Sequence, residues 1–108
     1  KYPTRSKAIA DLINESFIKE KWKKGGVVAG AIILVYNHHK RELVDRLTDI
    51  QHDYHHLVIS TQHIHLDRDN CLEIVAVKGK AKDIEILANK LKGTKGVKHS
   101  SIAITSEK

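Results

Sequence analysis

Residues 63–73 read HIHLDRDNCLE, and this stretch decides how the chain folds around its most informative side chains. Polar, turn-forming residues in its middle predict a chain reversal centred on Arg68, with a strand on either side. Side chains alternate between the two faces of a strand, so His63 and His65 should point the same way. The stretch therefore predicts a β-hairpin that presents two imidazoles on one face.

The predicted register brings a thiol to the same face. With Arg68 at the centre, Cys71 lies opposite His65 and Glu73 lies opposite His63, and directly opposed residues share a face. Two imidazoles and a thiolate then converge beside a carboxylate. This is an incomplete site for a borderline transition metal, which usually takes a fourth ligand. The alternative interpretation is that the histidines are ordinary surface residues and Cys71 is a core thiol.

The missing ligand is expected from the run QHDYHH at residues 51–56. Any of its histidines, His52, His55 or His56, could serve, either within one chain or across a subunit interface. The alternative is a polar, solvated helix end, where an imidazolium suits the negative end of the helix dipole. The residues alone leave this choice open.

The hydrophobic pattern divides the chain into two predicted parts. A helix capped by Thr4 or Ser6 should run to about Lys21, and its apolar stripe has no obvious partner in the chain. After Gly25 and Gly26 the pattern predicts strand, helix, strand, strand, helix and strand. This order indicates an α+β, ferredoxin-like βαββαβ domain with both helices on one face of the sheet.

The second part can be divided further from its periodicity. The expected strands cover residues 27–36, 57–66, 71–78 and 97–105. Asn37 is expected to cap a first helix, and a second helix is expected over residues 83–92. The hairpin ligands are expected on the sheet face opposite to the helices, together with Leu57, Ile59, Val75 and Val77. An apolar face without helices needs a cover, and a second subunit is the simplest one.

Composition narrows the class of protein. The 108 residues include 19 Lys and Arg against 13 Asp and Glu, a net charge of +6 that weakly favours an anionic partner such as nucleic acid. A single Cys excludes an intrachain disulfide and favours a reducing, cytoplasmic location. The longest apolar run, residues 27–36, is too short to cross a membrane. The chain begins at Lys1 and contains no Met, and we interpret it as a fragment.

Four motifs together resemble the nickel-responsive transcriptional regulators (NikR). They are QH at 51–52, STQHIH at 60–65, DNCLEI at 69–74 and KG at 78–79. The resemblance extends over essentially the whole chain. Residues 1–24 resemble the C-terminal helix of a ribbon-helix-helix DNA-binding domain, and residues 27–108 resemble the ferredoxin-like (ACT-like) nickel-binding and tetramerisation domain.

The resemblance implies a cytoplasmic repressor, not an enzyme, that binds double-stranded operator DNA as a homotetramer under the control of nickel(II). It implies that His63, His65 and Cys71 of one subunit and His52 of its neighbour hold the metal in a square plane. No membrane partner is expected.

Further roles follow for residues near these sites. Gln51 and Glu73 are the expected hydrogen-bond partners of the ligand imidazoles. Arg5 and Ser6, near a helix N-terminus, are expected to contact DNA phosphates. The family has a second cation site built partly from two carboxylates. Lys7 stands where one of them is expected, so no second metal is predicted there.

Two other function classes compete with this interpretation. A small-molecule-sensing ACT-like regulatory module without metal would have the same fold but would not need His-x-His facing a Cys. An enzyme with Cys71 as nucleophile and His65 as base is disfavoured, because the sequence offers no oxyanion-hole motif.

Overall fold

The computed structural model describes residues 26–105, which form a four-stranded sheet and two helices. In chain order the elements are β1 (Val27–Asn37), α2 (Arg41–Asp53), β2 (Val58–His65), β3 (Asn70–Lys80), α3 (Ala81–Lys92) and β4 (Val97–Thr105). The helix expected in residues 1–24, and with it Arg5, Ser6 and Lys7, lies outside the described residues.

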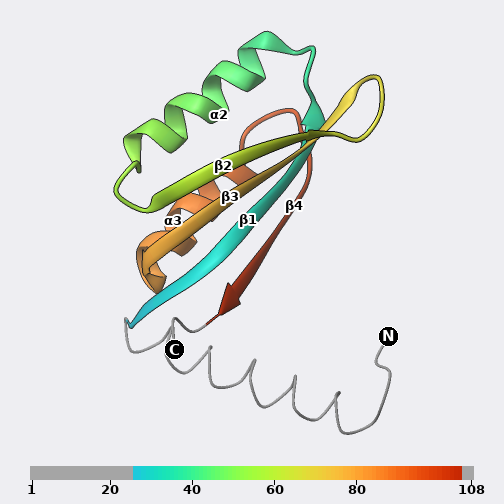
Figure 1. Ribbon diagram of the computed structural model, residues 1–108. Coiled ribbons are helices and arrows are strands. Elements are labelled where there is room, and N and C mark those ends of the chain that lie inside the picture. The colour runs from blue at the N-terminus through green and yellow to red at the C-terminus, as the bar shows by residue number, and fades with distance from the viewer. Residues whose placement is uncertain (1–25, 106–108) are drawn as a thin grey trace, which may run out of the picture.

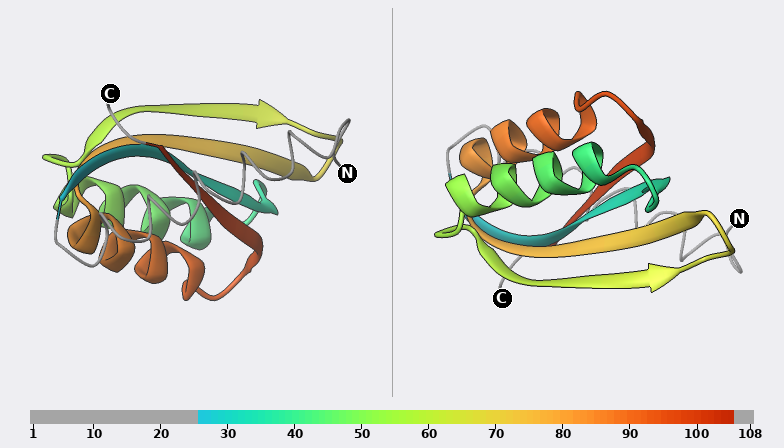
Figure 2. Two further views of the ribbon diagram at one scale, coloured as in Figure 1. Left: turned by 90° about the horizontal axis from the view of Figure 1, so that it is seen from below. Right: turned by 90° about the horizontal axis from the view of Figure 1, so that it is seen from above.

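The strands pair in the order β2-β3-β1-β4, and every pairing is antiparallel (Figure 1). Both described helices pack on one face of this sheet, and among residues 26–105 no helix lies on the other face (Figure 2). The predicted ferredoxin-like order is therefore confirmed. None of the described helices is long and apolar enough to cross a membrane.

The core lies between the sheet and the two helices. Alternate residues of β1, namely Val28, Ile32 and Leu34, are fully buried there. Each helix contributes one apolar stripe to the core, and the buried residues of these stripes are Leu43, Leu47, Ile84, Leu87 and Leu91. Hydrophobic burial on one stripe of each helix thus attaches both helices to the sheet.

The predicted start of the first described helix is wrong. Asn37 does not cap it, because Asn37 still pairs with Asn70 as the last residue of β1. The Asn37 side chain instead accepts a hydrogen bond from the His39 backbone N–H at 2.9 Å. The helix begins only after this turn, at Arg41, and no side chain caps it.

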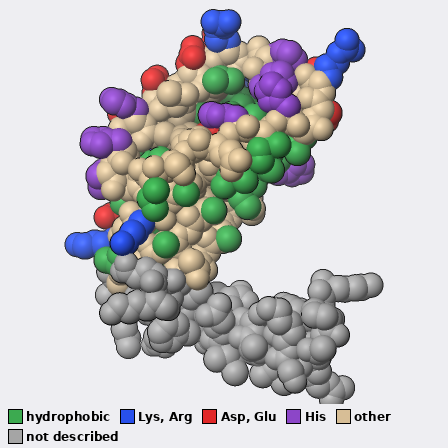
Figure 3. Space-filling model, in the orientation of Figure 1, with side chains coloured by type: hydrophobic (Ala, Val, Ile, Leu, Met, Phe, Trp, Pro, Cys, Tyr) green, Lys and Arg blue, Asp and Glu red, His purple; other side chains and the backbone are tan. Residues whose placement is uncertain are grey.

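The prediction of which β3 residues lie on the helix-free face of the sheet is also wrong. Val75 and Val77 are fully buried beneath the helices rather than on the open face. The two faces of β3 are both largely apolar, so the alternation could not tell which one the helices cover. By the strand register the open face carries Ile33, Val35, Ile64, Leu72 and Ile74 instead. Apolar side chains are spread over this face (Figure 3).

Candidate metal centre

The hairpin has the register that the sequence predicts. His65 pairs with Cys71 and His63 pairs with Glu73 between β2 and β3. Asp67 closes the turn, because its Oδ1 accepts hydrogen bonds from the backbone N–H groups of Asp69 at 2.9 Å and Asn70 at 2.8 Å. Hydrogen bonds from Asn70 and then from Asp69 lower the pKa of the Asp67 carboxyl below its usual value.

The two imidazoles and the thiol therefore share one face, and this prediction is confirmed. The face is the one that carries the helices, so the expectation that these residues lie opposite to the helices is wrong. Cys71 is buried, with 2% of its surface exposed, because β3 is a central strand. His63 and His65 are exposed because β2 lies at the sheet edge.

The single chain does not present a closed site. Within residues 26–105, no three His, Cys, Asp or Glu side chains are grouped closely enough to hold one metal ion. The His65 ring stacks on His38, with 4.5 Å between the ring centroids. Two nitrogens and a sulfur on neighbouring strands nevertheless fit a borderline metal such as nickel or copper, provided that the side chains rotate inward and a further donor joins them.

A buried carboxylate lies beside the candidate ligands. Glu73 is 2% exposed, and it accepts hydrogen bonds from Tyr36 Oη at 2.5 Å and from Gln51 Nε2 at 2.5 Å. The His63 Nε2 atom lies 3.3 Å from Glu73 Oε1. Thr61 Oγ1 in turn donates to Gln51 Oε1 at 2.8 Å. The structure thus brings Gln51 and Glu73 together next to His63, while their role in orienting a ligand stays a prediction.

Sequence reasoning missed Tyr36 as a member of this cluster. Tyr36 lies directly opposite Cys71 in the β1–β3 pairing and is 1% exposed. Burial, followed by the hydrogen bond to Glu73 and the charges of Glu73 and Cys71, raises the pKa of the Tyr36 phenol far above its ordinary value. The sequence did contain one indication of this role. Tyr36 lies at an inward position of an apolar strand, and a buried tyrosine hydroxyl requires a hydrogen-bond partner.

His52 lies in the last turn of α2, where its side chain is exposed. The His55 Nδ1 atom lies 3.1 Å from the His52 carbonyl oxygen. No hydrogen bond or ring contact among the described residues joins His52 to His63, His65 or Cys71.

The neighbouring Gln51 shows on which side of the sheet this helix end lies. Because Gln51 reaches Glu73, the end of α2 and the candidate ligands lie on the same side of the sheet. This contact also contradicts the expectation that the hairpin ligands lie on the sheet face opposite to the helices.

Two further histidines lie beside the hairpin turn. The Nε2 atoms of His38 and His39 are each 3.0 Å from the Arg68 carbonyl oxygen. The His39 Nε2 atom is also 3.6 Å from Asp69 Oδ1. Sequence reasoning assigned these histidines no partner, because only the pairing of β1 with β3 brings the end of β1 to the turn.

Comparison with known proteins gives an independent result. Residues 29–105 match the family described as the NikR C-terminal nickel-binding domain. A protein of Chlorobium phaeobacteroides named as a nickel-responsive regulator is 56% identical over 105 residues, covering 97% of this chain and 78% of the relative. A protein of Chlorobaculum parvum with the same name is 56% identical over the same shares of both chains. One of Syntrophus aciditrophicus is 54% identical over 104 residues, covering 96% and 76%.

Proposed function

This chain belongs to the NikR family of nickel-responsive regulators, and we propose that it controls transcription in the cytoplasm by coupling nickel(II) binding to operator binding. The observation that carries the proposal is the hairpin register, which presents His63, His65 and Cys71 on one face. Residues 1–24 would supply part of the DNA-binding domain, with Arg5 and Ser6 toward the phosphates. The protein would act as a regulator rather than as an enzyme.

We propose that His63, His65 and Cys71 of one subunit and His52 of another hold the nickel ion. The register offers three donors on one face, and a metal of this class usually takes four, which supports a further donor from outside the hairpin. A planar set of three nitrogens and one sulfur suits d⁸ nickel(II) better than zinc, which prefers a tetrahedron. Bound nickel would act as a Lewis acid that coordinates donor atoms from two subunits. It would link the subunits and would not catalyse a reaction.

The contact between Gln51 and Glu73 supports a route by which the metal acts on the assembly. Gln51 precedes His52, so the residue that would bridge to the next subunit is attached to the cluster at its own hairpin. A metal that requires His52 in one place favours the subunit arrangement that provides it. Binding energy that differs between two arrangements shifts their populations and thereby couples to DNA affinity.

A homotetramer is the assembly that we propose. In the part of the chain that the structure describes, no helix covers the sheet face that carries Ile33, Val35, Leu72 and Ile74. A second copy of the same face would bury these side chains in a two-fold interface. Metal bridges through His52 would then join such pairs.

Nickel titration tests the ligand set. We expect one nickel per chain and a thiolate-to-nickel absorption band in the near ultraviolet. Cys71→Ser should abolish the band, and His52→Ala should weaken binding at least about tenfold while the far-ultraviolet circular dichroism spectrum stays unchanged. His56→Ala is the matched control, because it removes an exposed imidazole from the same run. Equal affinity of the His52 and His56 variants would exclude the bridging role of His52.

A further inference from the structure

The last turn of α2 carries His52, and the residue before it is held at both ends of its side-chain amide. Gln51 Nε2 donates a hydrogen bond to Glu73 on β3, and Gln51 Oε1 accepts one from Thr61 Oγ1 on β2 at 2.8 Å. A flip of this amide would set its oxygen against the Glu73 carboxylate, where both groups are acceptors. The two partners therefore fix one orientation of Gln51.

Thr61 belongs to the strand that carries the two proposed imidazole ligands. Thr61, His63 and His65 are alternate residues of β2, so they share one face of the sheet. Thr61 pairs with Val75, which is buried beneath the helices, so this is the face that the helices cover. The bond from Thr61 to Gln51 thus joins the ligand strand directly to the end of α2.

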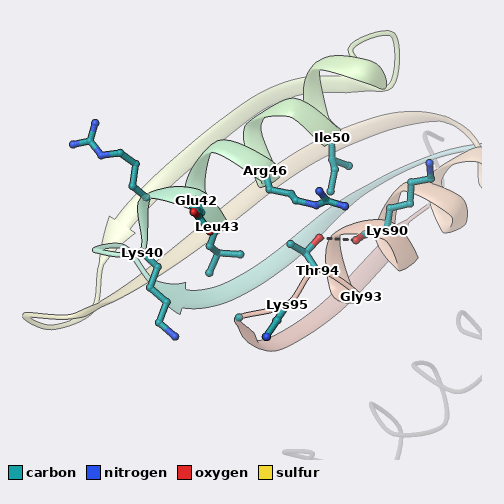
Figure 4. A pocket seen from close by; sticks show the side chains of 11 residues that line it. Lys40, Glu42, Leu43, Arg46, Ile50, Lys90, Gly93, Thr94 and Lys95 are labelled. Carbon is teal, nitrogen blue, oxygen red and sulfur yellow. Dashed lines mark hydrogen bonds between the residues drawn. The ribbon is translucent and has the colours of Figure 1, made fainter.

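A second anchor holds the chain just after His52. Tyr54 packs against the core, and its backbone N–H donates to the carbonyl oxygens of Ile50 and Gln51. Lys90 extends from α3 toward α2, and its Nζ lies 5.5 Å from the centre of the Tyr54 ring (Figure 4). An ammonium near the face of an aromatic ring is attracted to it. The backbone of His52 therefore lies between two anchored neighbours, while its own side chain is exposed.

Anchoring of this kind affects the affinity of a site that two subunits share. A donor on a mobile segment loses conformational freedom when it binds, and this loss weakens binding. A donor on a segment that is already fixed avoids most of the loss. Contacts within one subunit can therefore strengthen a bond that His52 makes outside that subunit.

We propose that Thr61 is a positioning residue for His52. Thr61 holds the Gln51 amide in the orientation that contacts Glu73. This contact fixes the last turn of α2, and the last turn directs His52 toward the neighbouring subunit. Thr61 is not itself a ligand. The inference rests on the proposed bridging role of His52, and it adds that strand β2 sets the place from which the bridging donor is offered.

Nickel titration of Thr61→Val tests the proposal on the 108-residue protein. Valine has nearly the shape of threonine but no hydroxyl, so Gln51 loses one partner and the nickel affinity should fall about threefold to tenfold. The thiolate-to-nickel band should keep its wavelength, because the hairpin donors are unchanged. Thr61→Ser keeps the hydroxyl and should bind nickel within about twofold of the wild type.

Thr48→Val is the matched control for the loss of a hydroxyl. Thr48 also lies on α2, but its Oγ1 donates to the Val44 carbonyl oxygen at 2.9 Å and takes no part in the contacts of Gln51. Its nickel affinity should equal that of the wild type. Amide hydrogen exchange of the metal-free protein gives a second readout, since exchange in the last turn of α2 should be faster in Thr61→Val than in Thr48→Val.

A double-mutant cycle separates positioning from a general structural role. In a His52→Ala background, Thr61→Val should change the nickel affinity by less than about twofold, because no imidazole remains to be positioned. A purely structural role of Thr61 would weaken binding equally in both backgrounds.

Any of three results would overturn the proposal: wild-type nickel affinity in Thr61→Val, unchanged exchange at the end of α2, or the same fold-change in both backgrounds. Wild-type affinity in His52→Ala alone would instead remove the bridging role itself, and this inference with it. The failure of the positioning role and the failure of the proposed ligand set are therefore distinguishable.

Discussion

At the scale of single residues, Glu73 is the group on which the candidate centre depends. A buried carboxylate costs several kcal/mol unless donors compensate it. Glu73 has two donors, Tyr36 and Gln51, and an imidazole, His63, that becomes a third when its Nε2 carries the proton. Each donor comes from a different element, so this one side chain ties β1, α2 and β2 to β3.

Tyr36→Phe tests the energetic role of this cluster. Removal of the phenol oxygen leaves Glu73 without one of its donors, so the free energy of unfolding should fall by about 1–3 kcal/mol. Urea denaturation of the metal-free protein measures the change. Tyr54→Phe is the control, because Tyr54 is only partly buried and its ring contact with Lys90 survives. Equal losses in both variants would contradict a special role for Tyr36.

The raised pKa of Tyr36 predicts how this stabilisation depends on pH. The phenol stays protonated in the folded protein, whereas in the unfolded chain it ionises near pH 10, its ordinary value. Its contribution is therefore complete below about pH 10 and is lost as the pH rises further toward the folded-state pKa. The stability difference between wild type and Tyr36→Phe should narrow above about pH 10, as read from urea midpoints. A difference that grows there would contradict the assignment.

At the scale of elements, the hairpin was predictable and the sides of the sheet were not. Turn chemistry at positions 67–70 and the pleat of the strands were enough to give the register of His65 against Cys71. The helix-covered face could not be chosen, because Val75 and Ile74 are equally apolar neighbours on β3. The place of Tyr36 beside Glu73 could not be predicted for a related reason. It depends on the pairing of β1 with β3, and local sequence patterns do not show which distant strands pair.

The loop between α3 and β4 gives a prediction about backbone geometry. Gly96 has a φ of +105°, and a Cβ placed there would lie 2.9 Å from Leu43 Cδ2. Gly96→Ala should therefore lower the stability by about 1–2 kcal/mol or more. Gly93→Ala is the matched control, because its φ of −78° suits alanine and its added Cβ would lie 3.2 Å from the Asn89 carbonyl oxygen, so only Gly96 combines a close contact with a left-handed φ. Thermal unfolding compares the two, and a larger loss at Gly93 would contradict this account.

At the scale of the whole molecule, the open sheet face sets the expected assembly. Ile64 is 37% exposed on that face, and Ile86 is 43% exposed on α3. Light scattering coupled to size exclusion should give a four-chain mass for the wild type. Ile64→Glu should lower that mass because it places a charge in the proposed interface, whereas Ile86→Glu should not. A lower mass for Ile86→Glu alone would move the interface to the helices.

Because β2 lies at the sheet edge, metal binding should stabilise this strand more than its neighbour β3. The proposed imidazole ligands belong to a strand hydrogen-bonded on one side only, while the proposed sulfur ligand belongs to an inner strand. A metal ion bound to both strands would cross-link the edge strand β2 to the inner strand β3. Amide hydrogen exchange should accordingly slow on nickel addition in residues 58–65 far more than in residues 70–80.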